Sequence, residues 1–215
     1  DRVRAVLGER GWDHEVIVID DGSADGTADV VEAASAARPG LRCVRQPENR
    51  GKGAAVRRGL EVATGELIGY IDADDKTDIS ALDQVTEAVA AGADIVIGDR
   101  TLSASDIQVP RRRYRQWGSE QFRRLLRWWM GLGEYPDTQC GFKFFRGAVM
   151  HDLFRSVQTD GYMFDVEILL LADRAGYTVR RIPVRWRDDP DSRFHPLWGS
   201  LRNLRELARI RRTHR

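Results

Sequence analysis

The sequence has little of what builds disulfide frameworks or histidine-based metal sites. It contains two cysteines, Cys43 and Cys140, which are far apart and form no CxxC motif, and its four histidines show no metal-ligand spacing. A disulfide-stapled fold is therefore not expected, and the composition suits a reducing compartment. No apolar run reaches about 18 residues and no signal peptide is visible, so the sequence predicts no membrane-spanning helix. If the protein meets a membrane, we expect it to lie on the surface.

The charge of the chain is balanced overall but uneven along its length. Its 34 Lys and Arg and 33 Asp and Glu residues give a net charge of +1, so we expect no nucleic-acid partner. Arginines gather in two segments, residues 111–131 and 195–215, each of which contains a single acidic residue. Such clusters indicate two local contacts with anions.

Short apolar runs alternate with helical segments through the first half of the chain. This alternation is typical of an α/β fold with a parallel sheet covered by helices on both faces, whose ligands bind beyond the carboxyl ends of the strands. Strands are expected at 15–19, 41–45, 67–71, 94–98 and 178–186, and helices at 3–10, 27–37, 54–63, 79–91 and 164–175.

A helix precedes the first predicted strand. Sheets of this kind usually begin with a strand, so we expect the natural protein to begin upstream and this chain to lack its first strand. Residues 1–194 are expected to form one domain, followed by a basic amphipathic helix over 195–215.

Two carboxylates, Asp72 and Asp74, follow the apolar run LIGYI. Alternation at the end of an extended strand places both on one side, where they repel each other unless a cation lies between them. Mg²⁺ or Mn²⁺ suits this position, because it accepts one or two carboxylates together with diphosphate oxygens and water. The pair is therefore a candidate metal site, with Asp74 also a candidate catalytic residue. The alternative is an ordinary acidic turn.

The segment Asp20-Asp21-Gly22-Ser23 ends the first predicted strand in the same way. Asp20, Asp21 and Gly22 are candidate contacts for a nucleotide, whose base or ribose the two carboxylates can hydrogen-bond. The alternative is a helix cap formed by Ser23 or Asp25.

Residues 49–53 form a glycine loop that opens a helix and contains Lys52. Backbone amides at a helix N-terminus suit an anion, and Lys52 is a candidate contact for a nucleotide ligand. Close packing of a strand against a helix is an equally good explanation of the glycines.

Six segments, in this order and spacing, resemble the family 2 glycosyltransferases, and within them the branch of dolichyl-phosphate glucosyltransferases and polyprenyl-phosphate mannosyltransferases. The resemblance covers residues 13–210, and its most specific part is DTQCGFKFF with IDADD upstream. It implies an α/β fold of the GT-A type with a mostly parallel sheet, a nucleotide-diphosphate sugar donor, and a polyprenyl-phosphate acceptor at the cytoplasmic face of a membrane. The segments are EVIVIDDGSADGT, NRGKGAAVRRGL, YIDADD, IVIGDR, DTQCGFKFF and FDVEILLLADRAGY.

By position, Asp20 and Asp21 match the nucleotide-contacting residues of this family, and Asp72 and Asp74 match its metal-binding DxD. Lys76 stands where the mannosyltransferase relatives carry a glutamine that helps to hold the metal, and a charged lysine is no metal ligand. The resemblance therefore favours UDP-glucose as the donor. A GDP-mannose-dependent enzyme and a non-catalytic nucleotide-sugar-binding remnant are the alternatives.

A polyprenyl phosphate is already an anionic nucleophile, so the reaction needs positioning and electrostatics more than a general base. Arginine binds phosphate with a planar, permanently charged fork. We therefore predict an acceptor-phosphate clamp of Arg185, Arg187, Ser192 and Arg193, with Arg193 also catalytic. A solvated charged turn is the alternative.

Asp165, at the start of the FDVEI helix, is by resemblance the candidate sugar-hydroxyl ligand or base, in preference to Glu167. The alternative is that these acids only complement the helix dipole. Gln139 and Cys140 are expected to shape the sugar pocket, with Asp137 as a further candidate. Cys140 is not expected to act as a nucleophile.

Two apolar stripes accompany the arginine clusters. Aromatic residues beside arginines are typical of the headgroup zone of a membrane, so we predict contact with an anionic membrane surface. Packing on the core of the domain is the alternative. The first stripe comprises Trp117, Phe122, Leu125, Leu126, Trp128, Trp129 and Met130, and the second Leu197, Leu201, Leu204, Leu207 and Ile210.

Overall fold

The computed structural model describes residues 2–108, 113–187 and 196–214. The strands are β1 (Val16–Asp20), β2 (Leu41–Arg45), β3 (Leu67–Ile71), β4 (Ile95–Gly98), β5 (Asp106–Ile107), β6 (Phe142–Arg146), β7 (Val179–Ile182) and β8 (Arg185–Trp186). The helices are α1 (Arg2–Glu9), α2 (Thr27–Ala36), α3 (Lys52–Leu60), α4 (Leu82–Ala90), α5 (Arg113–Leu125), α6 (Gly147–Phe154), α7 (Phe164–Ala175) and α8 (Pro196–Thr213). A 3₁₀ turn, η1 (Ile79–Ala81), precedes α4, and a π-helical segment, η2 (Leu126–Met130), continues α5.

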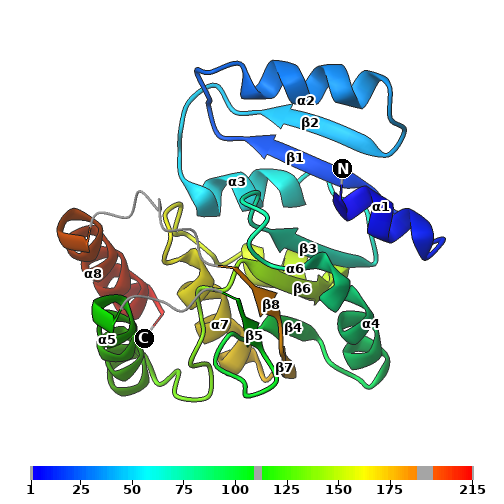
Figure 1. Ribbon diagram of the computed structural model, residues 1–215. Helices are drawn as coiled ribbons and strands as arrows, with labels where there is room; N and C mark the ends of the chain where they lie inside the picture. Colours follow the sequence, from blue (N-terminus) through cyan, green and yellow to red (C-terminus); the bar gives the residue numbers. More distant parts are fainter. Residues whose placement is uncertain (1, 109–112, 188–195, 215) are drawn as a thin grey trace.

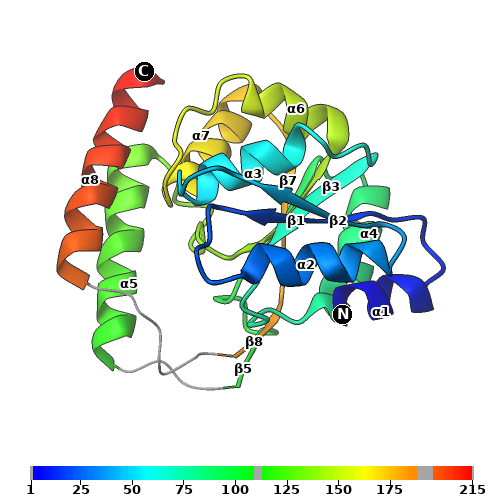
Figure 2. The same ribbon diagram turned by 90° about the horizontal axis from the view of Figure 1, so that it is seen from above.

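The central sheet has four strands in the order β3-β6-β4-β7. Strand β6 runs antiparallel to both of its neighbours, whereas β4 and β7 are parallel. A second sheet pairs β1 and β2 in parallel, with α2 on one side and α3 on the other (Figures 1 and 2). A short parallel pair, β5–β8, lies beside the central sheet.

The predicted α/β class with flanking helices is confirmed, but the central sheet is mixed rather than mostly parallel. The cause is β6, a strand that was not predicted from the sequence. Its FKFF run is buried on both faces, as is typical of a strand in the middle of a sheet. By inserting between β3 and β4, it separates two strands that remain parallel to each other and end at the same edge.

Side chains of the central sheet alternate between two apolar layers. Ile95 and Ile97 of β4 face the layer that contains α6 and α7, whereas Val96 faces the layer that contains η1 and α4. On β6, Phe142 and Phe144 share the second layer and Phe145 the first. The sheet is therefore covered on both faces, and its strand ends remain for the site.

Helices α5 and α8 lie side by side at one end of the molecule, away from α1 and α2 (Figures 1 and 2). Leu207 and Ile210 of α8 are buried in the same layer as α7, together with Leu126 and Met130 of η2. None of the described helices has the length and apolar character that crossing a membrane requires.

Each predicted apolar stripe divides between core and surface. Leu201 and Leu204 are 56% and 42% exposed, although Leu207, one turn further along α8, is fully buried. Trp128 is 85% exposed, although Leu126 is buried. Core packing thus accounts for one part of each stripe and leaves the other part open. The side chains of Trp117 and Leu197 lie outside the described part of the chain.

Candidate active site

The carboxyl ends of β3 and β4 meet the start of β6 at one edge of the central sheet. Asp72 follows β3, and its backbone amide donates to the carbonyl of Gly141, 3.0 Å away. A Cβ atom on Gly141 would lie 2.0 Å from Cγ of Asp72. Only glycine at this position lets the turn over residues 137–141 lie against the carboxylate.

The two carboxylates of the DxD segment each pair with a different lysine. Oδ1 of Asp72 lies 2.8 Å from Nζ of Lys52, and Oδ2 of Asp74 lies 3.0 Å from Nζ of Lys76. The side chains of Asp72 and Asp74 are 38% and 44% exposed, so both reach the surface instead of the core. Asp75 closes the turn in the left-handed backbone region, with a φ of 53°. Lysines thus supply the positive charge that this acidic pair requires.

The donor set of Asp72 and Asp74 fits a hard divalent cation. Such a cation takes one or two protein carboxylates and completes its coordination with diphosphate oxygens and water. Within the described residues, no cluster of three or more His, Cys, Asp or Glu side chains is arranged around a common point. The two half-exposed carboxylates therefore suit a metal that arrives with a diphosphate better than a fully protein-coordinated metal.

Behind Asp72 lies a buried charged cluster centred on Asp165, the first-turn acid of α7. Its Oδ1 accepts hydrogen bonds from the Tyr70 hydroxyl and from Nζ of Lys143, each at 2.5 Å. Its Oδ2 lies 3.7 Å from Nζ of Lys52 and has no hydrogen-bond partner within residues 2–108, 113–187 and 196–214. The side chains of Lys143 and Asp165 are 0% and 1% exposed. Removing one partner of such a buried pair typically costs about 3–5 kcal/mol.

The same contacts set the protonation of the neighbouring groups. Burial lowers the pKa of Lys52, but the carboxylates of Asp165 and Asp72 raise it by more, so its ammonium stays charged. Burial and the adjacent Asp165 carboxylate raise the pKa of Tyr70 well above its ordinary value, so its hydroxyl remains a donor. Lys52 is therefore a permanent cation between an open carboxylate and a buried one.

Asp20 and Asp21 end β1 but have different surroundings. Asp21 accepts hydrogen bonds from the amides of Arg50 and Gly51, both at 2.9 Å, and from Nε2 of Gln46 at 2.6 Å. Asp20 is 6% exposed, and its buried Oδ1 has no hydrogen-bond partner in the described part of the chain. Asp21 thus fixes the glycine loop, whereas Asp20 keeps a free oxygen for a ligand.

Gly22 has a φ of 74°, and a Cβ atom there would lie 2.5 Å from the backbone of Glu48. This close approach, together with the positive φ, explains why position 22 requires a glycine. Gly26 is the N-cap residue of α2. Of the two capping candidates, Asp25 satisfies a helix amide, because its Oδ1 accepts a hydrogen bond from the backbone N–H of Thr27, the first residue of α2, at 3.1 Å.

Packing explains the glycines of the loop over residues 49–53. The amides of Gly53 and Ala54 donate to the carbonyl of Asp160, at 2.8 and 3.2 Å. A Cβ atom on Gly51 would lie 2.6 Å from the same carbonyl oxygen. Because the amides of Gly53 and Ala54 already have acceptors, they are not available to an anion. The side chain of Lys52 is the part of the loop that reaches the acidic edge of the central sheet, which is formed by Asp72, Asp74 and Asp165.

In the turn over residues 137–141, one polar side chain is paired with an arginine and another has no hydrogen-bond partner among the described residues. Asp137 accepts three hydrogen bonds from Arg100, at 2.7–2.9 Å. Burial raises the pKa of Asp137, but Arg100 lowers it by more, so the pair is ionised. Nε2 of Gln139 is buried without a hydrogen-bond partner. Burial, with Asp137 nearby, raises the pKa of the Cys140 thiol to about 12, so this thiol is neutral.

Two members of the predicted phosphate clamp are described. Nε of Arg185 donates to Oδ2 of Asp106 at 3.1 Å, and its side chain is 58% exposed. The side chain of Arg187 is exposed, and its amide donates to the carbonyl of Lys76, 2.9 Å away. Strand β8 therefore runs beside the DxD turn. Ser192 and Arg193 lie outside the described residues.

Three residues of this site were not predicted from the sequence: Tyr70, Arg100 and Lys143. Arg100 directly follows the acid at the end of β4, so the strand-end rule that selected Asp72 also applies to it. Lys143 is a single charge within an aromatic run, which indicates a buried charge that needs a partner. Nothing in the local sequence identifies that partner as Asp165.

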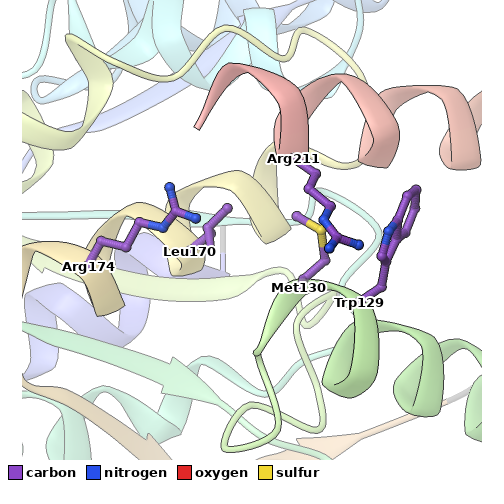
Figure 3. A pocket seen from close by; sticks show the side chains of 5 residues that line it. All are labelled: Trp129, Met130, Leu170, Arg174 and Arg211. Carbon is purple, nitrogen blue, oxygen red and sulfur yellow. The ribbon is translucent and has the colours of Figure 1, made fainter. Parts of the chain in front are cut away.

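A separate pocket of about 340 Å³ lies between η2, α7 and α8 (Figure 3). The guanidinium of Arg211 lies 5.5 Å from the ring centroid of Trp129. None of the acidic residues described above lines this pocket, so we do not assign the chemistry to it. Its lining residues are Trp129, Met130, Leu170, Arg174 and Arg211.

Residues 2–154 match the family described as glycosyl transferase family 2. The chain belongs to this family. It is 33% identical over 207 residues to the dolichyl-phosphate beta-glucosyltransferase ALG5C of Trichomonas vaginalis, covering 91% of this chain and 59% of that protein. It is also 33% identical over 211 residues to the dolichyl-phosphate beta-glucosyltransferase of Drosophila melanogaster, covering 94% and 64%. The chain thus spans less than two thirds of the length of these relatives.

Two solved structures have the same fold. Glucosyl-3-phosphoglycerate synthase from Mycobacterium tuberculosis, crystallised with Mn²⁺ and UDP-glucose, has a TM-score of 0.68 and 19% identity, covering 97% of this chain and 72% of that chain. Mannosyl-3-phosphoglycerate synthase from Rubrobacter xylanophilus has a TM-score of 0.68 and 19% identity, covering 97% and 67%. These similarities confirm the predicted GT-A fold of this family 2 domain.

Proposed function

We propose that this family 2 domain transfers a hexose, with UDP-glucose as the favoured donor, to a polyprenyl or dolichyl phosphate. The observation that carries the proposal is the pair of half-exposed carboxylates, Asp72 and Asp74, in front of the buried Lys52–Asp165 contact. The relatives named dolichyl-phosphate beta-glucosyltransferase support the acceptor and the sugar. The structural neighbour crystallised with Mn²⁺ and UDP-glucose supports the donor.

The residues of the site have distinct roles in this reaction. Asp72 and Asp74 would hold Mg²⁺ or Mn²⁺, which when bound neutralises charge on the departing diphosphate. Lys52 adds a fixed positive charge beside them. Asp20 contributes its free carboxylate oxygen to the nucleotide, and Asp21 holds the loop that carries Lys52.

The acceptor supplies the nucleophile of the proposed inverting transfer. A phosphate oxygen attacks C1 of the sugar from the side opposite the diphosphate, and the C1–O bond to the diphosphate breaks as the new bond forms. No proton has to leave the nucleophile, so the reaction needs no general base. Asp165 acts instead as a ligand of a sugar hydroxyl through Oδ2.

A clamp for the acceptor phosphate would be formed by Arg185, Arg187, Ser192 and Arg193. Arg187 has no side-chain partner among the described residues, and its backbone is tied to the DxD turn through Lys76. A planar guanidinium beside the diphosphate suits a second phosphate group.

We further propose that the domain, residues 1–194 with the basic helix over 195–215, lies peripherally on the cytoplasmic face of an anionic membrane. Trp128, Leu201 and Leu204 support this proposal, because they are large apolar side chains exposed on the adjacent η2 and α8 segments. Arginines on the same helices would attract anionic lipid, each by roughly 1 kcal/mol near the surface.

The test is a transfer assay with radiolabelled UDP-glucose, Mn²⁺ and a polyprenyl phosphate in detergent or vesicles. We expect labelled glycolipid that disappears when the metal is chelated. Transfer from GDP-mannose alone would reassign the donor, and absence of glycolipid with either donor would refute the proposal. Calorimetric binding of UDP-glucose without transfer would identify the non-catalytic remnant instead.

A further inference from the structure

We infer that Lys143 is a positioning residue that orients two ligand-binding groups toward the donor sugar; this inference rests on the proposed function. Lys143 lies in the middle of β6, opposite Tyr70 of β3 and Ile97 of β4. Its side chain is fully buried. Its ammonium donates to Oδ1 of Asp165 at 2.5 Å and to the carbonyl of Cys140 at 2.6 Å.

One ammonium thereby connects two elements that are distant in the sequence. Asp165 begins α7, and Cys140 belongs to the turn over residues 137–141. Each element carries a buried polar atom that has no hydrogen-bond partner among the residues that the structure describes: Oδ2 of Asp165 on the helix and Nε2 of Gln139 on the turn. Buried polar groups are normally satisfied, so two unsatisfied atoms on elements joined by the same cation indicate an external ligand.

The chemistry of the two free atoms specifies the ligand class. A carboxylate oxygen accepts hydrogen bonds, and the amide nitrogen of a glutamine donates them. Sugar hydroxyls do both, so the hydroxyl groups of a hexose match the chemistry of the two atoms. The Asp165 carboxylate cannot turn to exchange its oxygens without losing the bonds from Tyr70 and Lys143 to Oδ1.

Core packing alone does not require a lysine at this position. The neighbours of Lys143 on β6, Phe142, Phe144 and Phe145, are apolar and buried, and a buried ion pair is often replaceable by apolar residues without loss of stability. A methionine opposite Tyr70 would fill a similar volume. What a methionine cannot do is hold the Asp165 carboxylate and the Cys140 carbonyl in one arrangement.

The experiment is a double-mutant cycle between Lys143→Met and Asp165→Asn, with Arg146→Met as the control on the same strand. Arg146 donates to the carbonyls of Ala93 and Val89, away from the acidic edge. We expect each single variant of the cycle to lower kcat/KM for UDP-glucose by about tenfold or more. Because both act through one carboxylate, the double variant should be no worse than the more impaired single one. Arg146→Met should retain wild-type kcat/KM.

Binding separates positioning from a purely structural role. By calorimetry, Lys143→Met should reduce the preference for UDP-glucose over UDP while leaving the Kd of UDP within about threefold. If the single variant does not fold, Lys143→Met/Asp165→Leu removes both charges; it should fold and still lack the preference. The inference is overturned if Lys143→Met keeps the wild-type kcat/KM, if its effect multiplies with that of Asp165→Asn, or if the doubly apolar variant keeps the preference.

Failure of the proposed function would look different. A wild-type protein that transfers no sugar refutes the transfer reaction, yet its preference for UDP-glucose over UDP still tests Lys143. A wild-type protein that transfers sugar, together with an unaffected Lys143→Met variant, refutes only the inference about Lys143.

Discussion

The acidic edge of the central sheet and the α5–α8 helix pair differ in how many of their charges are paired. At the edge, Asp72, Asp74 and Asp165 each have a lysine within 4 Å, so the charges are balanced inside the protein. On α8, the arginines at 205 and 209 have no acidic partner among the described residues. A site that binds a metal and an anionic substrate gains from internal counter-ions, whereas unpaired surface arginines are available to an external anion.

The two regions also differ in how they use apolar side chains. Around the acidic edge, aromatic rings enclose the charges: Phe164 lies 5.5 Å from Tyr70, and Nζ of Lys52 lies 5.7 Å from the Phe164 ring. On the helix pair, Trp128 and Leu201 are open to solvent. The edge is thus preorganised in the isolated domain, while part of the helix pair is left without a partner.

The largest effect should come from the open carboxylates. Asp72→Asn or Asp74→Asn should lower the transfer rate by on the order of 10³. The metal that neutralises charge on the departing diphosphate would lose one of its carboxylate ligands. The melting temperature should change little, since both side chains are partly exposed. Asp75→Asn is the matched control, because within the described part of the chain the Asp75 side chain pairs with Arg2, on the surface. Equal loss in all three variants would contradict a specific metal site.

Leu204 and Leu207, one turn apart on α8, test whether only part of its apolar stripe is buried in the core. Leu207→Ala should lower the free energy of unfolding by about 2–5 kcal/mol, because Leu207 is fully buried against α7. Leu204→Ala should change it by about 0.5 kcal/mol or less. Urea unfolding measures both. Similar losses would mean that α8 is buried along its whole length and that the contrast between core and surface is wrong.

Gly141 tests how closely the turn must approach Asp72. Gly141→Ala should lower the transfer rate by about tenfold, because the new Cβ atom would displace the Asp72 carboxylate. Gly8→Ala in α1 is the control: nothing lies within 4 Å of a Cβ atom there. That control should keep full activity and gain up to about 1 kcal/mol of stability from better helix propensity. Full activity of Gly141→Ala would show that the edge tolerates a shifted Asp72.

Trp128 tests whether the helix pair meets a membrane. Trp128→Ala should weaken binding to anionic vesicles by about tenfold without changing the melting temperature, because Trp128 is 85% exposed. Val30→Ala removes an exposed apolar side chain on α2 and should have no effect on binding. Co-sedimentation at low and high salt gives the result, and binding should weaken as salt screens the arginines. Indifference of the wild-type protein to anionic lipid would refute the membrane proposal.

The smallest effect should come from Cys140. Because burial raises the pKa of this thiol to about 12, it stays protonated at neutral pH and is a poor nucleophile. Cys140→Ser should therefore retain activity within about threefold. The unfolded thiol ionises near pH 8.5, so the folded state should lose stability as the pH rises from about 8.5 toward 12. Fast alkylation of Cys140 in the native protein at pH 8 would contradict this assignment.

Local sequence patterns predicted the first four described strands within one or two residues. Short apolar runs such as LIGYI are bounded by glycine and aspartate, so their ends are visible without any knowledge of their partners. The same patterns placed Asp20 and Asp72 at strand ends. They missed β6, because its antiparallel place between β3 and β4 depends on pairing with segments far away in the sequence.

By itself, the sequence determined the α/β class, the family, and the carboxylates that follow the strands, because these depend on residue type, order and spacing. The tertiary structure decided that Lys143 holds Asp165, that the loop amides bind Asp21 and Asp160, and that only part of the α8 stripe is buried. The physical reason is that a periodic pattern identifies which face of an element is apolar or charged. Which other element covers that face depends on contacts between residues far apart in the chain.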